Sequence, residues 1–389
     1  MKAKLALSLS SLLGSLVVLE CVLRIFHITP NDLRAMEYTH NIYSLEDHGR
    51  GQPPAVFFPN RMSHQVYYKC LATKCTEDKR VEWRTNSFGM RDRERSLTKG
   101  KNTTRIIVLG DSFTAGVGVA AEETYPQQLE KLLNSRHDGR PQFEVWNTAV
   151  SGFSTFDEWH YLMKYGLRFR PDLIVVGLYL NDSVPWGPFS NPKTNPELLD
   201  SPRIRKFQLS YRPMIKNQLT GNIKSTWTFR HSLYISNWVH AAMVVWRTNP
   251  ATIRLYRFWW SEDNWIGMGH FKEALEGLSR LQRERNIPVL ILVWPKLDWL
   301  DGNYPFDDVH DKIRSLCAKY GLASVDLLPL LRGRKPSSLW VHPTDHHPNA
   351  WAHRLAATTL MGRLSNDPLF KTHLNIPLTL PPTPAADVR

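Results

Sequence analysis

The chain contains the stretch RIIVLGDSF at residues 105–113, in which an unbroken apolar run meets a glycine, an acid and a serine. A short β-branched run of this kind predicts a strand buried on both faces, as in a parallel sheet. Open α/β sheets bind their ligands at the carboxyl ends of such strands. A serine there, Ser112, can act as a nucleophile where a histidine and a carboxylate reach it from elsewhere. Taken alone, the tripeptide favours a plain polar turn between a strand and a helix.

Further segments downstream repeat this arrangement. A second strand candidate, residues 144–150, ends at SGFS, and a third, residues 172–180, ends at Asn181. Helices are expected between these strands, which predicts a parallel sheet with helices on both faces. Right-handed crossovers would bring the three strand ends together at one edge. Much later, HPTDHHPN at residues 342–349 opens a helical stretch.

Serine, glycine, asparagine and histidine, each at a strand end or a helix start and in this order, resemble the SGNH hydrolase superfamily, the GDSL esterases and lipases. The resemblance covers roughly residues 80–365 apart from an insertion. It extends upstream to RTNSFGMRD, residues 84–92, which is similar to a segment of membrane-anchored bacterial members. It implies an α/β fold of the flavodoxin-like type, a three-layer sandwich around a parallel central sheet. It implies no cofactor and no metal.

The resemblance also implies ester hydrolysis or acyl transfer by a serine mechanism. Ser112 would attack the acyl carbon, His347 would take its proton and return it to the leaving alkoxide, and Asp345 would orient the imidazole. The oxyanion would be held by the backbone N–H groups of Ser112 and Gly152 and by the side-chain amide of Asn181. A glycine suits its position because a side chain would crowd the substrate. An asparagine donates without adding a charge.

The acid departs from the common spacing of the family, which places it three residues before the histidine. A threonine occupies that position here, so we expect Asp345, two residues before His347, to be the acid. His346 is expected to be a loop residue, and His342 either a polar group on the substrate side or a residue without a role. Without Ser112 upstream, the cluster would favour a solvated loop that caps the next helix.

The N-terminus predicts attachment to a membrane. Two lysines precede an apolar run at residues 5–23 that contains one charged residue, Glu20. As a helix, such a run would span about 28 Å, close to the hydrocarbon thickness of a bilayer. A cleaved signal peptide is the alternative, but no small-x-small cleavage site follows the run. We therefore expect residues 1–28 to form a single-pass transmembrane anchor, with the catalytic domain outside the cytoplasm, in the periplasm or at the cell surface.

Charge and cysteine content limit the partners. The net charge of +13 comes from 49 Lys and Arg against 36 Asp and Glu, spread along the chain without a nucleic-acid motif, so no nucleic-acid partner is expected. A basic surface suits anionic lipids or glycans, although a generally basic solvated surface fits as well. Cys70 and Cys75 bracket a four-residue loop and predict either a disulfide or two free thiols. Cys317 is expected in a helix core.

The remaining organisation follows from composition. Residues 29–100 are expected to form an accessory β segment, residues 101–366 the hydrolase domain and residues 367–389 a disordered tail. An aromatic insertion at about residues 184–265 favours buried packing, with a lid or substrate platform for sugar or acyl chains as the alternative. Its tryptophans are Trp227, Trp238, Trp246, Trp259, Trp260 and Trp265.

Two classes of function are compatible with the sequence. The first is an anchored serine esterase that acts on ester-linked acyl groups of a cell-envelope glycan or lipid, with an O-acyltransferase on envelope polysaccharide as its variant. The second is a non-catalytic protein that binds or assembles an envelope glycan. The predicted set of Ser112, Gly152, Asn181 and His347 favours the enzyme, because a pure binding protein has no need of it. Only the spacing of the acid favours the second class.

Overall fold

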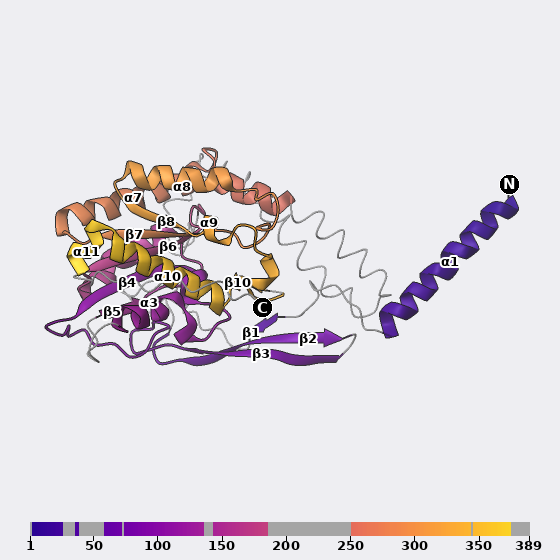
Figure 1. The fold of residues 1–389 in the computed structure, drawn as a ribbon, viewed down its shortest axis with the longest axis horizontal. Coiled ribbons are helices and arrows are strands. Elements are labelled where there is room, and N and C mark those ends of the chain that lie inside the picture. Colours follow the sequence, from indigo (N-terminus) through magenta and orange to yellow (C-terminus); the bar gives the residue numbers. More distant parts are fainter. Residues whose placement is uncertain are drawn as a thin grey trace, which may run out of the picture. The chain divides into compact units, whose positions relative to one another are not determined.

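Five parallel strands form the central sheet of the computed structural model, in the order β5-β4-β6-β7-β8 (Figure 1). The structure describes residues 2–25, 36–38, 58–71, 74–135, 143–185, 250–343 and 345–374. The strands are β4 (Thr104–Gly110), β5 (Phe143–Asn147), β6 (Leu173–Tyr179), β7 (Val289–Trp294) and β8 (Ala323–Asp326). This order is that of flavodoxin-like sheets. The predicted α/β class and parallel central sheet are therefore confirmed.

Strand β4 lies inside the sheet because its side chains are apolar on both faces. Ile106, Ile107 and Val108 are fully buried. The strand pairs in parallel with β5 on one side and with β6 on the other. Because all three strands run in the same direction, their carboxyl ends lie next to one another. Those ends lead into Ser112, Gly152 and Asn181, as the crossover argument predicts.

Helices cover both faces of the sheet. Helices α3 and α10 pack against each other on one face, and α4 and α7 pack against each other on the opposite face (Figure 1). Side-chain caps fix where several of them begin: Ser154 caps α4, Asn264 caps α7 and Asn349 caps α10. The helices of the sheet region are α2 (Ser112–Ala115), α3 (Tyr125–Asn134), α4 (Thr155–Lys164), α7 (Trp265–Arg285), α8 (Asp307–Lys319), α9 (Leu328–Leu331) and α10 (Ala350–Asn366), with short 3₁₀ turns η2 (Ala121–Glu123), η3 (Gly166–Phe169) and η5 (Pro336–Ser338).

Two predictions outside the sheet are corrected or extended. The tail predicted as disordered from residue 367 begins with a helix, α11 (Pro368–Leu374), because Phe370 and Leu374 bury their side chains. In the accessory segment, β1 (Met36–Tyr38), β2 (Met62–Leu71) and β3 (Lys74–Arg84) form a three-stranded sheet. The side chains of Cys70 and Cys75 lie outside the described residues, so their disulfide stays a prediction. Cys317 is buried in α8, as expected.

The described end of the aromatic insertion is packed. Trp259 and Trp260 are buried, and the Trp260 indole N–H donates a hydrogen bond of 2.8 Å to the carbonyl oxygen of Leu180. The Ser183 hydroxyl donates to the Trp259 carbonyl at 3.0 Å. These contacts lie directly beside Asn181 in the chain, so this part of the insertion supports the end of β6. Residues 186–249, with Trp227, Trp238 and Trp246, lie outside the described residues.

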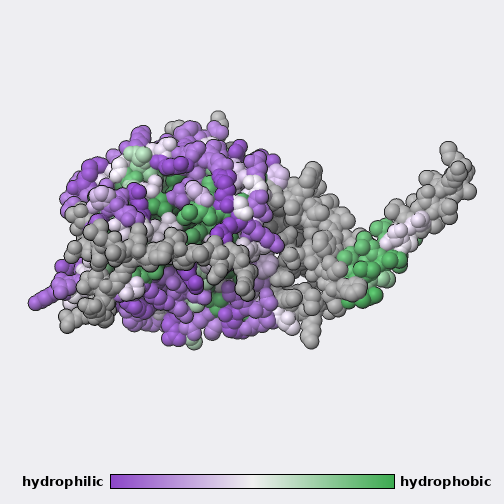
Figure 2. All heavy atoms as spheres, viewed as in Figure 1, coloured by the Kyte–Doolittle hydropathy of each residue, from purple (hydrophilic) through white to green (hydrophobic). Residues whose placement is uncertain are grey.

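Residues 2–25 form helix α1, which belongs to the smaller of two compact units of the chain. Leu13, Val18 and Ile25 are among its exposed apolar side chains, seen in green in Figure 2. Nevertheless, none of the described helices is both long enough and apolar enough to cross a membrane. The predicted transmembrane helix is therefore not supported. Four serines, a glycine and Glu20 interrupt the apolar run between residues 5 and 23. The parallel sheet belongs to the larger unit.

Gly110 of β4 and Gly177 of β6 are paired in the sheet, and both allow Thr114 of α2 to lie close to it. A Cβ atom at Gly177 would lie 2.2 Å from Thr114 Oγ1 and 2.4 Å from the Tyr125 hydroxyl. We expect Gly177→Ala to lower the free energy of unfolding by about 3 kcal/mol, because the overpacked side chains have no free space. Gly269→Ala is the matched control, since its Cβ would meet nothing within 4 Å on helix α7. Urea unfolding should show the control unchanged or slightly stabilised.

Candidate active site

Three side chains form a continuous hydrogen-bonded chain at the carboxyl edge of the sheet. Ser112 Oγ lies 2.9 Å from His347 Nε2, and His347 Nδ1 lies 2.5 Å from Asp345 Oδ1. Ser112 is the first residue of α2, directly after β4. His347 and Asp345 come from β10 (Asp345–Pro348), which pairs antiparallel with β9 (Trp340–His342). The fold thus brings together all three members of the predicted triad, although 235 residues separate the serine from the histidine.

The unusual spacing of the acid follows from the extended backbone of β10. Side chains two residues apart in a strand point to the same face, so Asp345 and His347 can meet directly. The Asp345 carboxylate accepts hydrogen bonds from both the backbone N–H of His347, at 3.1 Å, and its ring Nδ1–H. With the proton on Nδ1, the Nε2 lone pair faces Ser112 and can accept its proton. A two-residue spacing therefore serves the same purpose as the common three-residue spacing.

The predicted oxyanion donors flank the serine on neighbouring strands. Gly152 follows β5 and has a φ of +82°, which favours glycine. A Cβ atom at Gly152 would meet no protein atom within 4 Å, so a side chain there would project into the space beside the site. Asn181 follows β6, on the other side of β4. The N–H of Ser112, in the first turn of α2, has no acceptor within its own helix.

We expect Asn181→Ala to lower kcat for nitrophenyl esters by about two to three orders of magnitude, because one of three oxyanion donors is lost. The loss should fall on kcat while KM changes little, since the charge develops only in the transition state. Initial rates over a range of substrate concentrations check this. Unchanged kcat in a folded variant would remove Asn181 from the mechanism.

Asp111 holds the turn that carries the serine. Its side chain caps α2 by accepting a hydrogen bond of 2.8 Å from the Phe113 backbone N–H, as expected of an acid beside the nucleophile. Burial raises the pKa of Asp111 to about 6, although the Phe113 N–H, His347 and the Asn181 amide act in the opposite direction. Phe113 itself stacks on Tyr179 at 3.9 Å between ring centroids.

Two more buried acids, Asp182 and Glu158, lie near the site. The Asp182 carboxylate accepts a hydrogen bond of 2.8 Å from the Thr155 hydroxyl. Neither carboxylate oxygen of Glu158 has a hydrogen-bond partner among the described residues. Burial, and then the nearby Asp182 and Asp111, raise the pKa of Glu158 well above its usual value. The burial of Glu158 could have been predicted from helical periodicity, because Glu158 lies three and four residues before Tyr161 and Leu162 on the buried face of α4.

We expect Glu158→Gln to become more stable relative to the parent protein as pH rises from 5 to 8. The folded-state pKa of Glu158 is raised, so the folded protein holds a proton that the unfolded chain releases above about pH 4.5. Stability is therefore lost as pH rises, by at most about 1.4 kcal/mol per pH unit for this one proton. Glutamine carries no such proton. Urea unfolding of both proteins at pH 5, 6.5 and 8 measures the difference, and parallel profiles would contradict the expectation.

His346 connects the catalytic strand to the segment after β7, so it is not the loop residue that was predicted. Its Nδ1 lies 2.7 Å from Asp298 Oδ1, and its ring stacks on Trp340 at 3.6 Å. Lys296 Nζ lies 2.6 Å from the other oxygen of Asp298. Burial opposes ionisation of Asp298, but Lys296 and His346 hold its pKa well below the usual range. His342, in β9, is buried.

No group of three or more His, Cys, Asp or Glu side chains in the described part of the chain is placed to hold a metal ion.

The chain belongs to the GDSL-like Lipase/Acylhydrolase family, whose model matches residues 108–355, more than half of the sequence. The protein is accordingly an enzyme of the class that hydrolyses ester bonds. The match begins within β4 and ends within α10, so it includes the serine, glycine, asparagine and histidine segments. No curated protein matches the chain.

Several solved structures are similar to this one at low identity. A two-domain esterase active on acetylated mannans is 14% identical over 72% of this chain, with a TM-score of 0.38, and the match spans 51% of that protein. TesA is 15% identical over 68% of this chain and 99% of its own, with a TM-score of 0.39. A variant of Axe2, an acetyl-xylooligosaccharide esterase from Geobacillus, is 12% identical over 68% of this chain and 95% of its own, with a TM-score of 0.38.

Proposed function

We propose that this protein is a serine esterase that removes ester-linked acyl groups from a glycan or lipid of the cell envelope. The observation that carries the proposal is the hydrogen-bonded chain from Ser112 Oγ through His347 to Asp345. Hydrogen-bond distances of 2.9 and 2.5 Å are those of a nucleophile in contact with its base and of a base oriented by an acid.

The proposed reaction has two halves. In the first, His347 Nε2 takes the proton of Ser112 as its Oγ bonds to the acyl carbon, and the imidazolium then gives that proton to the departing alcohol. In the second, a water molecule loses its proton to His347 and attacks the acyl-serine, which releases the acid and restores the serine. The N–H groups of Ser112 and Gly152 and the amide of Asn181 stabilise the oxyanion in both halves. Asp345 orients the His347 ring in both halves through its bond to Nδ1.

An envelope location is the second part of the proposal. The basic start of the chain and the exposed apolar side chains of α1 support delivery of the protein to the secretory route. The net charge of +13 supports an anionic surface as the place of action. Protease digestion of intact spheroplasts and of lysed spheroplasts tests this part. A chain protected in intact spheroplasts and cleaved only after lysis would place it in the cytoplasm and contradict the location.

Ester hydrolysis by the full-length protein tests the chemistry. Nitrophenyl acetate, butyrate and decanoate are compared with His347→Ala as the background, and the chain-length preference distinguishes a deacetylase from a lipase. Adding an oligosaccharide acceptor distinguishes hydrolysis from transfer, since an acyltransferase forms acyl-sugar at the expense of free acid. Folded protein with no activity above His347→Ala in either assay would favour the non-catalytic, glycan-binding alternative.

A further inference from the structure

An arginine holds the carbonyl end of helix α2 and the loop that follows it. Helix α2 has one turn, so its last carbonyl groups have no donors within the helix. Arg91 bonds the last of these and two carbonyls just beyond the helix: its Nη1 donates to the carbonyl oxygen of Ala115 at 2.8 Å and to that of Gly116, and its Nη2 donates to that of Val119 at 2.5 Å. One guanidinium thus bonds three carbonyls of the segment that follows the predicted nucleophile.

The guanidinium is buried and lies over an aromatic ring. Arg91 is 1% exposed, and its guanidinium carbon lies 4.1 Å from the centroid of the Trp83 ring. Trp83 packs in turn against Ala115 in the same buried cluster. Gly116 allows the close approach, because a Cβ atom there would lie 3.0 Å from Arg91 Nη1. Only a planar group with several donors in a fixed arrangement can make these contacts at once.

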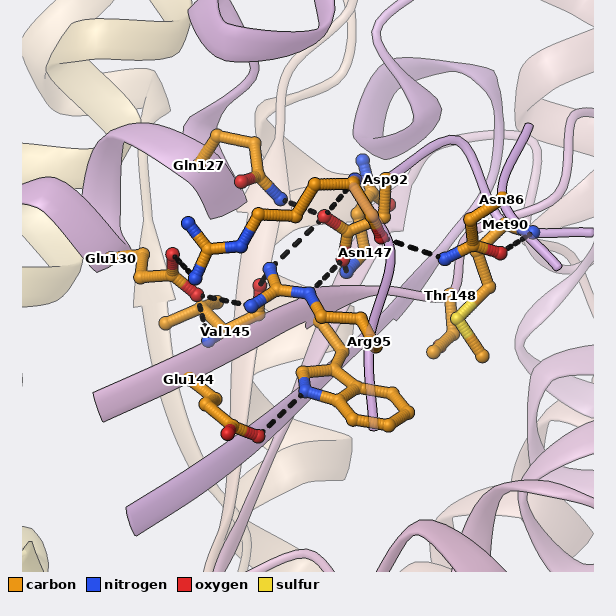
Figure 3. A network of polar contacts seen from close by, with 12 residues as sticks. Asn86, Met90, Asp92, Arg95, Gln127, Glu130, Glu144, Val145, Asn147 and Thr148 are labelled. Atoms are coloured by element: carbon orange, nitrogen blue, oxygen red, sulfur yellow. Dashed lines mark hydrogen bonds and ion pairs between the residues drawn. The ribbon is translucent and has the colours of Figure 1, made fainter. Parts of the chain in front are cut away.

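Asp92, the residue directly after Arg91, is attached to the sheet by an ion-pair network (Figure 3). Asp92 pairs with Arg95 at 3.0 Å, and Arg95 pairs with Glu130 of α3 at 2.7 Å. The Asp92 carboxylate also accepts the backbone N–H of Asn147, at the end of β5. The Asn147 side-chain amide then donates to a fourth carbonyl of the α2 region, that of Thr114, at 3.1 Å. Through Asp92 and Asn147, the segment that carries Arg91 is therefore bonded both to the end of β5 and to α2.

We propose that Arg91 is a positioning residue for the nucleophile. By holding the carbonyl end of α2, it sets the direction of the one helical turn whose first residue is Ser112. That turn fixes both the Oγ atom that attacks and the backbone N–H that stabilises the oxyanion. A displacement of about 1 Å at such a site can cost about a hundredfold in rate. The inference rests on the proposed role of Ser112.

Arg91→Lys and Arg91→Ala test it in the full-length protein. Lysine keeps the charge but cannot bond three carbonyls at once, so we expect kcat to fall about a hundredfold in both variants while KM changes less than threefold. The rate at which a fluorophosphonate labels the serine should fall by the same factor, because it depends on the same Oγ and N–H. Added guanidinium ion should restore part of the activity of Arg91→Ala.

Arg105 provides a matched control, because it is an equally buried arginine at the opposite end of β4. Its guanidinium carbon lies 4.3 Å from the Trp146 ring centroid, and its Nη1 donates to the Phe169 carbonyl at 2.7 Å. Arg105→Lys should lower the unfolding temperature and leave the kcat of the folded fraction unchanged.

Three outcomes decide the question. A wild-type kcat in Arg91→Lys, with an inactive Ser112→Ala, would overturn this inference alone. An active Ser112→Ala would overturn the proposed mechanism and the inference with it. If Arg91→Ala does not fold, Arg91→Lys carries the test. If the kcat of Arg91→Lys falls no further than that of Arg105→Lys, Arg91 has only a structural role.

Discussion

Ser112→Ala is expected to reduce kcat for nitrophenyl esters by a factor on the order of 10⁴ to 10⁶. Alanine removes the oxygen that forms the acyl-enzyme, while the oxyanion donors and the substrate contacts remain. KM should therefore change much less than kcat. The variant should remain folded, since the Ser112 hydroxyl makes its hydrogen bond at the surface of the site, with the ring of His347. Steady-state kinetics on the full-length protein provide the measurement.

Ser135→Ala is a suitable control, because Ser135 is an exposed residue at the end of α3 whose hydroxyl donates to the carbonyl oxygen of Leu132. It should retain full activity. Ser112→Ala with more than a tenth of the parent kcat, after exclusion of a contaminating esterase, would show that another group attacks the ester.

Asp345→Asn is expected to lower kcat by about four orders of magnitude. An amide at this position can donate its own N–H to His347 Nδ1, which leaves the ring proton on Nε2. That tautomer faces Ser112 with a donor instead of an acceptor and cannot take the proton of the serine. The structure would barely change, so the loss would come from the proton position and not from geometry.

Asp298→Asn is the matched control for this prediction. Its carboxylate also bonds a histidine Nδ1, that of His346, at 2.7 Å, but this histidine has no contact with the serine among those described. We expect less than a tenfold loss of kcat. Equal losses in the two variants would mean that Asp345 supports the local structure and that the acid of the mechanism has to be sought elsewhere.

The inner strands of the sheet and the residues at their ends could be predicted because β4, β6 and β7 are short apolar runs that end abruptly. β6 is buried along its whole length and β4 from its second residue on, and such apolar segments can be recognised from the sequence alone. Right-handed crossovers between parallel strands then place the three strand ends at one edge. In this way the relative placement of Ser112, Gly152 and Asn181 followed from local patterns and one general rule.

The histidine side of the site was predicted by residue type but not by conformation. Residues 345–348 are DHHP, which has no apolar alternation, so nothing in the segment indicates a strand. Its extended form depends on pairing with β9 and on the contact of His346 with Asp298, 48 residues earlier in the chain. Contacts of this kind depend on tertiary packing and cannot be predicted from the local sequence pattern. The same is true of Arg91, whose acceptors are backbone carbonyls and leave no signature in sequence.

The central claim, that Ser112 is activated for attack on an acyl carbon, is tested most directly by mass spectrometry after reaction with a fluorophosphonate. The reagent loses fluoride and forms one phosphonate ester with an activated serine. We expect a single adduct per chain, mapped to the peptide that contains residues 110–113, and no adduct in His347→Ala. An adduct on another residue, or none in folded protein, would contradict the account.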